Sequence, residues 1–260
     1  MYVFVCENSI EGIFTGVYNA WASGYGFRNI RLSLAAHTTY ELFCEYIEVT
    51  PDPVKSQSVG RTICNRFGSE VYQNLCQAIL AETKDKKNQL DKADCIYHTV
   101  LLAFALYDGS HVLEALHDPY VARIFELSRA TYNEAHHLLG FLRFKELANG
   151  VLFSTIHPKN DVLPILAEHF TDRLPIEHFM IYDKTHKTAA LHKASDGFVL
   201  IDASDLNQEL VNQLSEREEE FQKLWCSFFN HIAIEARKNP KLQSQNIPLR
   251  FWKDTVELAR

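Results

Sequence analysis

The segment 141–157 constrains the fold more than any other part of the chain, because it carries the pattern of a β-hairpin. Two largely apolar stretches, Phe141–Leu147 and Val151–His157, flank the dipeptide Asn149-Gly150. This dipeptide between two such stretches is typical of a type I′ turn. The pattern therefore predicts an antiparallel strand pair in the second half of the chain.

The residues that follow predict a short helix, three more strands and a long helix. Apolar stretches separated by turn residues predict strands at 178–183, 188–193 and 198–201, after a helix at 161–173. An apolar stripe then predicts a helix over 206–238. We expect an α+β fold, in which an antiparallel sheet (hairpin plus meander) packs against long helices. The 206–238 helix should cover one face of that sheet.

The N-terminal half is predicted to be mainly helical over 54–139. Apolar residues recur every four positions from Ile63 to Ile79, and Gly68-Ser69 could divide this run into two helices. Tyr2–Cys6 has the composition of a buried strand. The sequence does not decide whether residues 1–49 join the sheet of the second half or form a small αβ unit of their own.

A polar segment of mixed charge, Glu82–Asp94, is the best candidate for a domain boundary. It divides the chain into an N-terminal αβ and helical segment, 1–83, and an α+β domain, 84–260. The two could also form one compact unit.

Composition excludes several classes of protein. The net charge of −7 excludes a broadly basic nucleic-acid-binding surface, although it permits a local basic patch. No apolar run approaches the roughly 20 residues that span a bilayer, and the N-terminus lacks the basic region of a secretory signal. We expect a cytoplasmic protein with no membrane partner.

Motifs for metals and nucleotides are also missing. The six cysteines contain no CxxC pair, and no HxH or HExxH motif is present, so we expect neither a metal nor a cofactor. Gly24-Tyr25-Gly26 lacks the third glycine of a dinucleotide-binding loop.

Four residues are candidates for acid–base catalysis. His157 follows a predicted strand, His169 and Asp172 lie three residues apart on a predicted helix, and Asp183 ends another strand. They could converge at one edge of the sheet. The alternative is that these histidines are structural and that the carboxylates lie on the surface.

Two groups of residues are candidates for nucleic-acid binding. Residues 237–260 hold six cations against two carboxylates, a net +4, and aromatic rings lie among them. In the hairpin region, cations could face a phosphate backbone. The candidate residues are Arg143, Lys145, Arg173, Arg237, Lys238, Asn239, Lys241, Gln243, Arg250 and Trp252. The alternative is that the tryptophans belong to the core and that the cations lie on solvated surfaces.

Three blocks carry a resemblance to a known family: His136–Pro175, Phe179–His192 and Trp225–Trp252. They are similar to a bacterial family of uncharacterised function, over about Ala93–Arg260. Members are found as partners of a radical SAM protein assigned to DNA modification or repair, and a related domain is fused to some uracil-DNA-glycosylase-like proteins. The matched positions are Gly140, Phe141, Arg143, Phe144, Pro158, His169, Phe170, Arg173, Trp225, Ile234, Glu235, Arg237, Asn239, Gln243, Pro248 and Trp252.

The resemblance implies a role in DNA repair or DNA metabolism, as a DNA-binding or adaptor subunit with a radical SAM protein as partner. The chain lacks the CxxxCxxC motif of radical SAM enzymes, so radical chemistry would belong to that partner. Two alternatives remain. The chain could be a hydrolase or glycosylase-like enzyme that uses the His/Asp site, or a purely structural partner that binds through an apolar groove. Whether the chain is an enzyme stays undecided.

Overall fold

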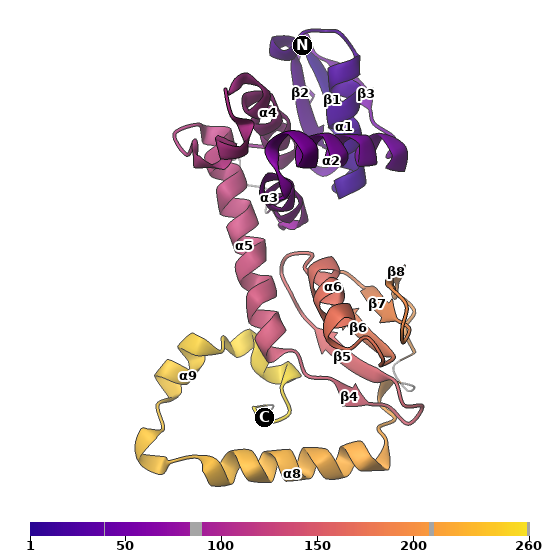
Figure 1. Ribbon diagram of the computed structural model, residues 1–260, viewed down its shortest axis with the longest axis vertical. Helices are drawn as coiled ribbons and strands as arrows, with labels where there is room; N and C mark the ends of the chain where they lie inside the picture. Colours follow the sequence, from indigo (N-terminus) through magenta and orange to yellow (C-terminus); the bar gives the residue numbers. More distant parts are fainter. Residues whose placement is uncertain (39, 84–89, 208–210, 259–260) are drawn as a thin grey trace. The chain divides into compact units, whose positions relative to one another are not determined.

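A computed structural model describes residues 1–38, 40–83, 90–207 and 211–258. The chain forms two compact units, Met1–Tyr132 and Asn133–Arg260, and helix α5 (Pro119–Phe141) crosses the division (Figure 1). The boundary predicted between residues 83 and 84 adjoins the segment 84–89, which is outside the described residues. That boundary stays a prediction.

The N-terminal unit contains its own sheet of three parallel strands. Strand β1 (Tyr2–Cys6) lies between β2 (Ile30–Leu34) and β3 (Glu45–Glu48), with Tyr2 opposite both Ile30 and Glu45. Helix α1 (Ile10–Ala22) carries the chain from β1 to β2, which brings the two strands into parallel register. Residues 1–49 therefore belong to a separate αβ unit.

Two local features fix the position of α1. Ser9 is the N-cap residue, and its side chain accepts a hydrogen bond from the Gly12 amide at 2.9 Å. Gly16 packs against β1 so closely that a Cβ atom there would lie 2.3 Å from Cys6 Sγ. A larger residue at position 16 would push the helix away from the strand.

Three helices follow the sheet along the chain: α2 (Pro53–Phe67) and α3 (Ser69–Leu80) pack against α1, and α4 (Lys92–Ala105) packs against β2. Gly68, with φ of 92°, separates α2 from α3, which confirms the division predicted at Gly68-Ser69. A left-handed φ is readily adopted only by glycine, so the sequence itself favours a break here. Short 3₁₀ helices occupy Phe27–Asn29, Ala35–His37 and Gly109–Glu114.

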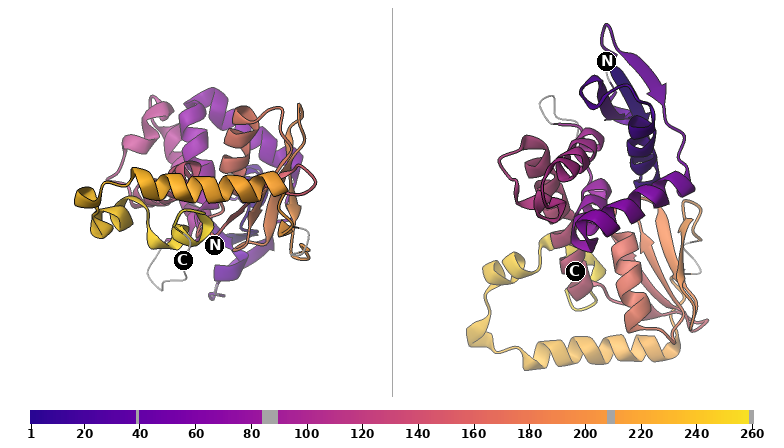
Figure 2. Two further views of the ribbon diagram at one scale, coloured as in Figure 1. Left: turned by 90° about the horizontal axis from the view of Figure 1, so that it is seen from below. Right: turned by 45° about the horizontal axis from the view of Figure 1, so that its top comes forward.

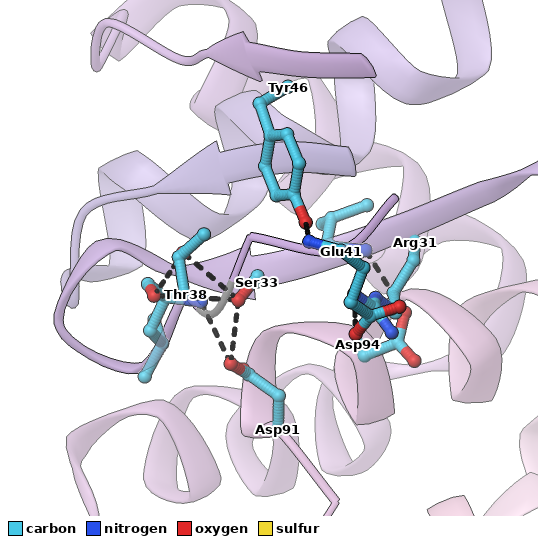
Figure 3. A network of polar contacts seen from close by, with 9 residues as sticks. Arg31, Ser33, Thr38, Glu41, Tyr46, Asp91 and Asp94 are labelled. Carbon is cyan, nitrogen blue, oxygen red and sulfur yellow. Dashed lines mark hydrogen bonds and ion pairs between the residues drawn. The ribbon is translucent and has the colours of Figure 1, made fainter. Parts of the chain in front are cut away.

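Carboxylates of α4 and of its N-cap residue cover the outer edge of β2 (Figure 3). Asp94 Oδ1 accepts the Leu32 amide at 3.0 Å, and Asp91 Oδ2 accepts the Leu34 amide at 2.9 Å and the Ser33 hydroxyl at 3.3 Å. An edge strand exposes unpaired N–H groups. The two carboxylates satisfy them and join helix to sheet.

The C-terminal unit contains a five-stranded sheet in the order β4-β5-β6-β7-β8. The strands are β4 (Lys145–Glu146), β5 (Leu152–Ile156), β6 (Phe179–Asp183), β7 (Thr188–His192) and β8 (Phe198–Asp202). Helix α6 (Leu163–Arg173) connects β5 to β6 and lies along one face of the sheet (Figures 1 and 2).

The prediction of an antiparallel sheet is wrong. The N-terminal sheet is parallel, and the C-terminal sheet is mixed because β5 and β6 run parallel. The reason is the helix between them. Helix α6 returns the chain from the end of β5 to the side of the sheet where β5 begins, so β6 runs in the same direction as β5. A two-residue sequence period identifies strands but does not give their direction.

The predicted hairpin exists but is short and closes with a different turn. Only Lys145–Glu146 pairs with β5. The Gly150 amide donates to the Leu147 carbonyl at 2.8 Å, and Gly150 alone of the central dipeptide has a positive φ, 79°. A type I′ turn needs positive φ at both central residues. The connection is instead a longer loop that ends in a left-handed glycine.

Apolar side chains on the two faces of this sheet contact different elements. Ile156, Phe179 and Ile181 pack against α6, the C-terminal half of α5 and Phe251. Phe153 and Tyr182 face the opposite way and pack against residues of the segment that follows β8, including Ala203 and Val211.

The predicted long helix over 206–238 is wrong in its length and position. Residues 208–210 lie outside the described residues, and helix α8 spans Glu216–Ile232. Its apolar stripe does not cover the sheet, because its four members are more than half exposed: Phe221, Leu224, Phe228 and Ile232. After α8 the chain forms a 3₁₀ turn (Glu235–Arg237), helix α9 (Pro240–Asn246) and the 3₁₀ helix η5 (Leu249–Asp254).

Among the described residues, no helix combines the length and the apolar character that crossing a membrane requires.

Candidate functional site

The carboxyl ends of the two parallel strands in the C-terminal unit bring distant polar residues together. Ile156 is paired with Asp183, and the Lys184 amide donates to the Ile156 carbonyl at 3.0 Å. His157 and Lys184 therefore leave the sheet side by side. Ligands of α/β proteins commonly bind at this edge, because the loops that follow parallel strands converge there.

A histidine–aspartate pair stands at this edge. His157 Nδ1 lies 3.0 Å from Asp254 Oδ2, and both side chains are largely shielded from solvent. Asp254 ends η5, which Phe251 anchors in the core at 2% exposure. Burial raises the pKa of Asp254, although the hydrogen bond from His157 and the charges of His157, Lys253 and Lys184 oppose that rise. A carboxylate that orients one ring nitrogen leaves the other available as an acid or base.

A second cluster lies at the end of β6. Asp183 is fully buried, and its Oδ1 accepts the amides of Thr185 at 2.8 Å and His186 at 3.1 Å. Its Oδ2 lies 2.6 Å from His186 Nδ1. One ligand-type atom from each of Asp161, Asp183 and His186 lies within 4.8 Å of the others. We call these three residues with His157 and Asp254 the carboxyl-edge cluster.

Glu134 fixes the loop that supplies His157 and Asp161. This residue of α5 is 3% exposed, and its carboxylate accepts the Lys159 amide at 3.0 Å, the Asn160 amide at 2.8 Å and the Asn160 side-chain amide at 2.7 Å. Arg250 Nη1 lies 3.0 Å from the same carboxylate. The loop after β5 and the segment that carries Asp254 are thus held by one buried group.

Residues 90–257 match the family model described as a domain of unknown function, DUF4130. The chain belongs to the DUF4130 family. This is nearly the region, Ala93–Arg260, over which the sequence resembles a known family, and it includes the whole carboxyl-edge cluster.

Other comparisons add little to this assignment. No curated protein matches the sequence. Among solved structures, a DHH domain described as coming from a member of a family of ribosomal proteins is similar, with a TM-score of 0.33 and 12% identity over 74% of this chain and 73% of that one. A likeness this slight carries no conclusion about fold or function.

The four predicted catalytic residues of the DUF4130 domain fall into two places. His157 and Asp183 lie at the carboxyl edge, on neighbouring strands. His169 and Asp172 lie farther along α6: at 1.5 Å per residue, His169 is about 9 Å from the first residue of that helix. His169 makes an edge contact with the Phe170 ring, and Asp172 is exposed. The structure therefore does not bring this pair to the cluster.

Four of the predicted nucleic-acid-binding cations have partners within the DUF4130 domain: Arg143, Lys145, Arg250 and Lys238. Arg143 donates to the Gly140 carbonyl at 2.9 Å and lies 3.0 Å from Glu257 Oε1. Arg250 pairs with Glu134. Lys145 lies 5.3 Å from the centre of the Phe153 ring, and burial lowers its pKa. Lys238 lies 2.5 Å from Glu235.

The remaining predicted residues are spread over the surface and one small helix. Arg173, Arg237 and Lys241 are exposed. Asn239 caps α9 by accepting the Leu242 amide at 3.0 Å, and Gln243 is half-buried within α9. The Trp252 indole donates to the Ile247 carbonyl at 2.8 Å, as expected of a packed tryptophan.

Sequence reasoning missed several members of the site: Asp161, His186, Asp254, Glu134, Lys184 and Lys253. The spacing Asp183-Lys-Thr-His186, which begins at the last residue of β6, was a local signal that could have identified His186. Nothing in the sequence connects Asp254 with His157, because 97 positions separate them.

Proposed function

We propose that this DUF4130 protein binds nucleic acid across its carboxyl-edge cluster, as a subunit of a DNA repair or DNA metabolism system. One observation carries the proposal: exposed lysines surround the His157–Asp254 pair. Lys184 and Lys253 both act electrostatically on Asp254, and Lys159 follows His157 by two residues. None of the three lysines forms a salt bridge with another residue in the described part of the chain.

A chain with a net charge of −7 needs such a local patch to attract a phosphate backbone. The proposed interface differs from the residues that the sequence suggested, because Arg143 and Arg250 hold buried carboxylates. Lysines without such partners remain available to replace counterions on phosphate.

Fluorescence anisotropy across a salt series tests this interface, with single-stranded and duplex DNA in the presence of EDTA. The double variant Lys184→Ala/Lys253→Ala should reduce the slope of log K against log salt by about 1.8 on duplex, because each phosphate contact contributes about 0.9. Lys193→Ala is the matched control. Lys193 is exposed and follows His192, the end of β7 that lies away from the carboxyl-edge cluster. An unchanged slope in the double variant, or no binding by the wild type at low salt, would contradict the proposal.

The same unit offers a surface for the radical SAM partner implied by the resemblance. The stripe of α8 repeats at helical spacing and is more than half exposed along its length. We propose that the partner covers this stripe. Leu224→Glu should abolish co-purification with the partner, whereas Lys223→Glu, on the neighbouring exposed position, should preserve it. Equal co-purification by both variants would exclude this face.

An acid–base function is the second candidate, and the 3.0 Å contact between His157 and Asp254 favours it. A hydrolase or glycosylase-like enzyme would use His157 as a general acid or base. If turnover of a damaged or uracil-containing oligonucleotide is found, His157→Gln should lower it about 100-fold or more while DNA affinity stays within about twofold. His169→Gln is the control. Full turnover by His157→Gln would exclude the role.

A further inference from the structure

We propose that Asp161, Asp183 and His186 bind a divalent transition-metal ion. They come from the loop before α6, the end of β6 and the turn after β6, and one ligand-type atom of each lies within 4.8 Å of the other two. The sequence contains no metal-binding motif, because only the folded chain brings these segments together. This inference does not depend on nucleic-acid binding.

The charges in this trio call for a cation. Asp183 has no exposed surface, and a second carboxylate, that of Asp161, stands near it. Two carboxylates at such short range repel each other strongly in a medium of low dielectric constant. His186 Nδ1 lies 2.6 Å from Asp183 Oδ2, and a bound metal ion would place positive charge between the two carboxylates.

The buried hydroxyl of Thr188 is an independent observation that points to a bound species. Thr188 is paired with Asp183 across β6 and β7, so both side chains project from the same face of the sheet. Its Oγ1 is buried and has no hydrogen-bond partner among the described residues. Buried hydroxyls are normally satisfied. A water molecule on a metal ion held by the trio would provide the missing partner.

The donor set indicates the class of ion. One imidazole nitrogen and two carboxylates suit Mn²⁺, Fe²⁺, Co²⁺ or Zn²⁺ better than Mg²⁺ or Ca²⁺, which favour all-oxygen sites. Three protein ligands leave coordination positions open, as in catalytic metal centres. An ion here would place a Lewis acid at the same edge of the sheet as the His157–Asp254 pair.

Calorimetric titration of the EDTA-treated, dialysed full chain with Mn²⁺ and with Zn²⁺ tests the site. We expect a single ion per chain. Asp161→Asn and His186→Gln should each weaken binding more than about 100-fold, since loss of a ligand should exceed the roughly 10–100-fold effect of losing a supporting residue. Asp172→Asn and His169→Gln are matched controls in the same unit and should leave binding unchanged.

Asp183 is not substituted, because its Oδ1 accepts two backbone amides and the turn would be disturbed. Paramagnetic broadening by Mn²⁺ in the wild-type chain gives a second measurement that needs no variant. Amides of residues 161 and 183–186 should broaden first.

Three results would overturn the proposal. They are no binding by the folded wild type, equal binding by Asp161→Asn and the wild type, and broadening centred elsewhere. Because the DNA titrations are made in EDTA, failure of the metal site and failure of the DNA interface can be distinguished.

Discussion

Each unit of this protein buries an aspartate at its sheet, and the two aspartates have different surroundings. Asp94 in the N-terminal unit accepts the amide of an edge strand, and its nearest histidine nitrogen, His98 Nε2, is 3.8 Å away. Asp183 in the C-terminal unit accepts amides of its own turn and contacts His186 at 2.6 Å. The first carboxylate completes a sheet. The second belongs to a cluster of ionisable groups beyond the ends of parallel strands.

The comparison shows that burial alone does not identify a functional carboxylate. The pKa of Asp94 rises to about 7, chiefly because of burial and in part because of Asp91, although the Leu32 amide and Arg31 oppose the rise. Such a shift is often taken as a sign of an active site. Figure 3 shows that Asp94 belongs to a network of polar contacts that joins helix and sheet. Its raised pKa therefore affects the stability of the fold.

The largest expected effect is on the pH dependence of the N-terminal unit. The folded chain holds the Asp94 proton up to pH about 7, whereas an unfolded aspartate loses it near 3.8. The free energy of unfolding should therefore fall as pH rises from about 4 to 7, by up to about 4 kcal/mol at about 1.36 kcal/mol per pKa unit. In Asp94→Asn this fall should vanish, because the amide oxygen still accepts the Leu32 amide without a charge.

Urea unfolding at pH 5 and pH 8 measures this effect, with hydrogen exchange of peptides covering residues 1–34 to report on the N-terminal unit. Glu70→Gln, at an exposed position of α3, is the control. A pH dependence of equal size in wild type and Asp94→Asn would mean that another titratable group near the network, such as His98, carries it.

The next effect concerns Glu134, a buried carboxylate of the C-terminal unit whose role resembles that of Asp94. Glu134→Ala should lower the stability of this unit by about 3 kcal/mol, because three N–H donors and the Arg250 guanidinium lose their acceptor. Hydrogen exchange in peptides over 152–162 should rise. The exposed Glu168 on α6 provides the control, Glu168→Ala, which should change stability by less than about 0.5 kcal/mol.

A smaller effect is expected at Arg143 and Glu257. Burial opposes ionisation of Glu257, but its hydrogen bonds and Arg143 hold its pKa below the usual range. Arg143→Met should lower stability by about 1 kcal/mol, and a double-mutant cycle with Glu257→Gln should give a coupling of similar size. The salt slope of DNA binding should not change. A reduced slope would return Arg143 to the nucleic-acid interface that the sequence suggested.

The smallest stability effect is expected at Asp254. Its own burial disfavours the charge, and an asparagine oxygen can still accept the His157 Nδ1–H. Asp254→Asn should change the midpoint of urea unfolding by the equivalent of about 1 kcal/mol or less. A loss as large as that predicted for Glu134→Ala would make Asp254 a structural group and weaken the contrast between the two units.

Much of the secondary structure could be predicted, but the way in which it assembles could not. Strands predicted at 178–183, 188–193 and 198–201 lie within one residue of β6, β7 and β8. The apolar stripe of α8 was equally visible, yet it does not cover the sheet. Periodicity shows that a helix has an apolar face and does not show which surface, if any, that face contacts.

The candidate site was predictable only where its residues stand at the ends of strands. Asp183 is the last residue of β6 and His157 directly follows β5, and the end of each strand can be read from its pattern. Arg143 and Arg250 were judged by their charge alone, and the structure shows both beside buried carboxylates.

The sequence by itself determined the α+β class, most strand and helix segments of both halves, the break at Gly68 and the resemblance to a family of unknown function. These follow from local periodicity, turn residues and motifs, which act over a few neighbouring positions. Only the tertiary structure decided that β5 and β6 run parallel, that Asp254 meets His157, and that Asp161, Asp183 and His186 converge. Such contacts join residues far apart in the chain, and they arise because the core formed by α5, α6, η5 and the sheet holds those segments together.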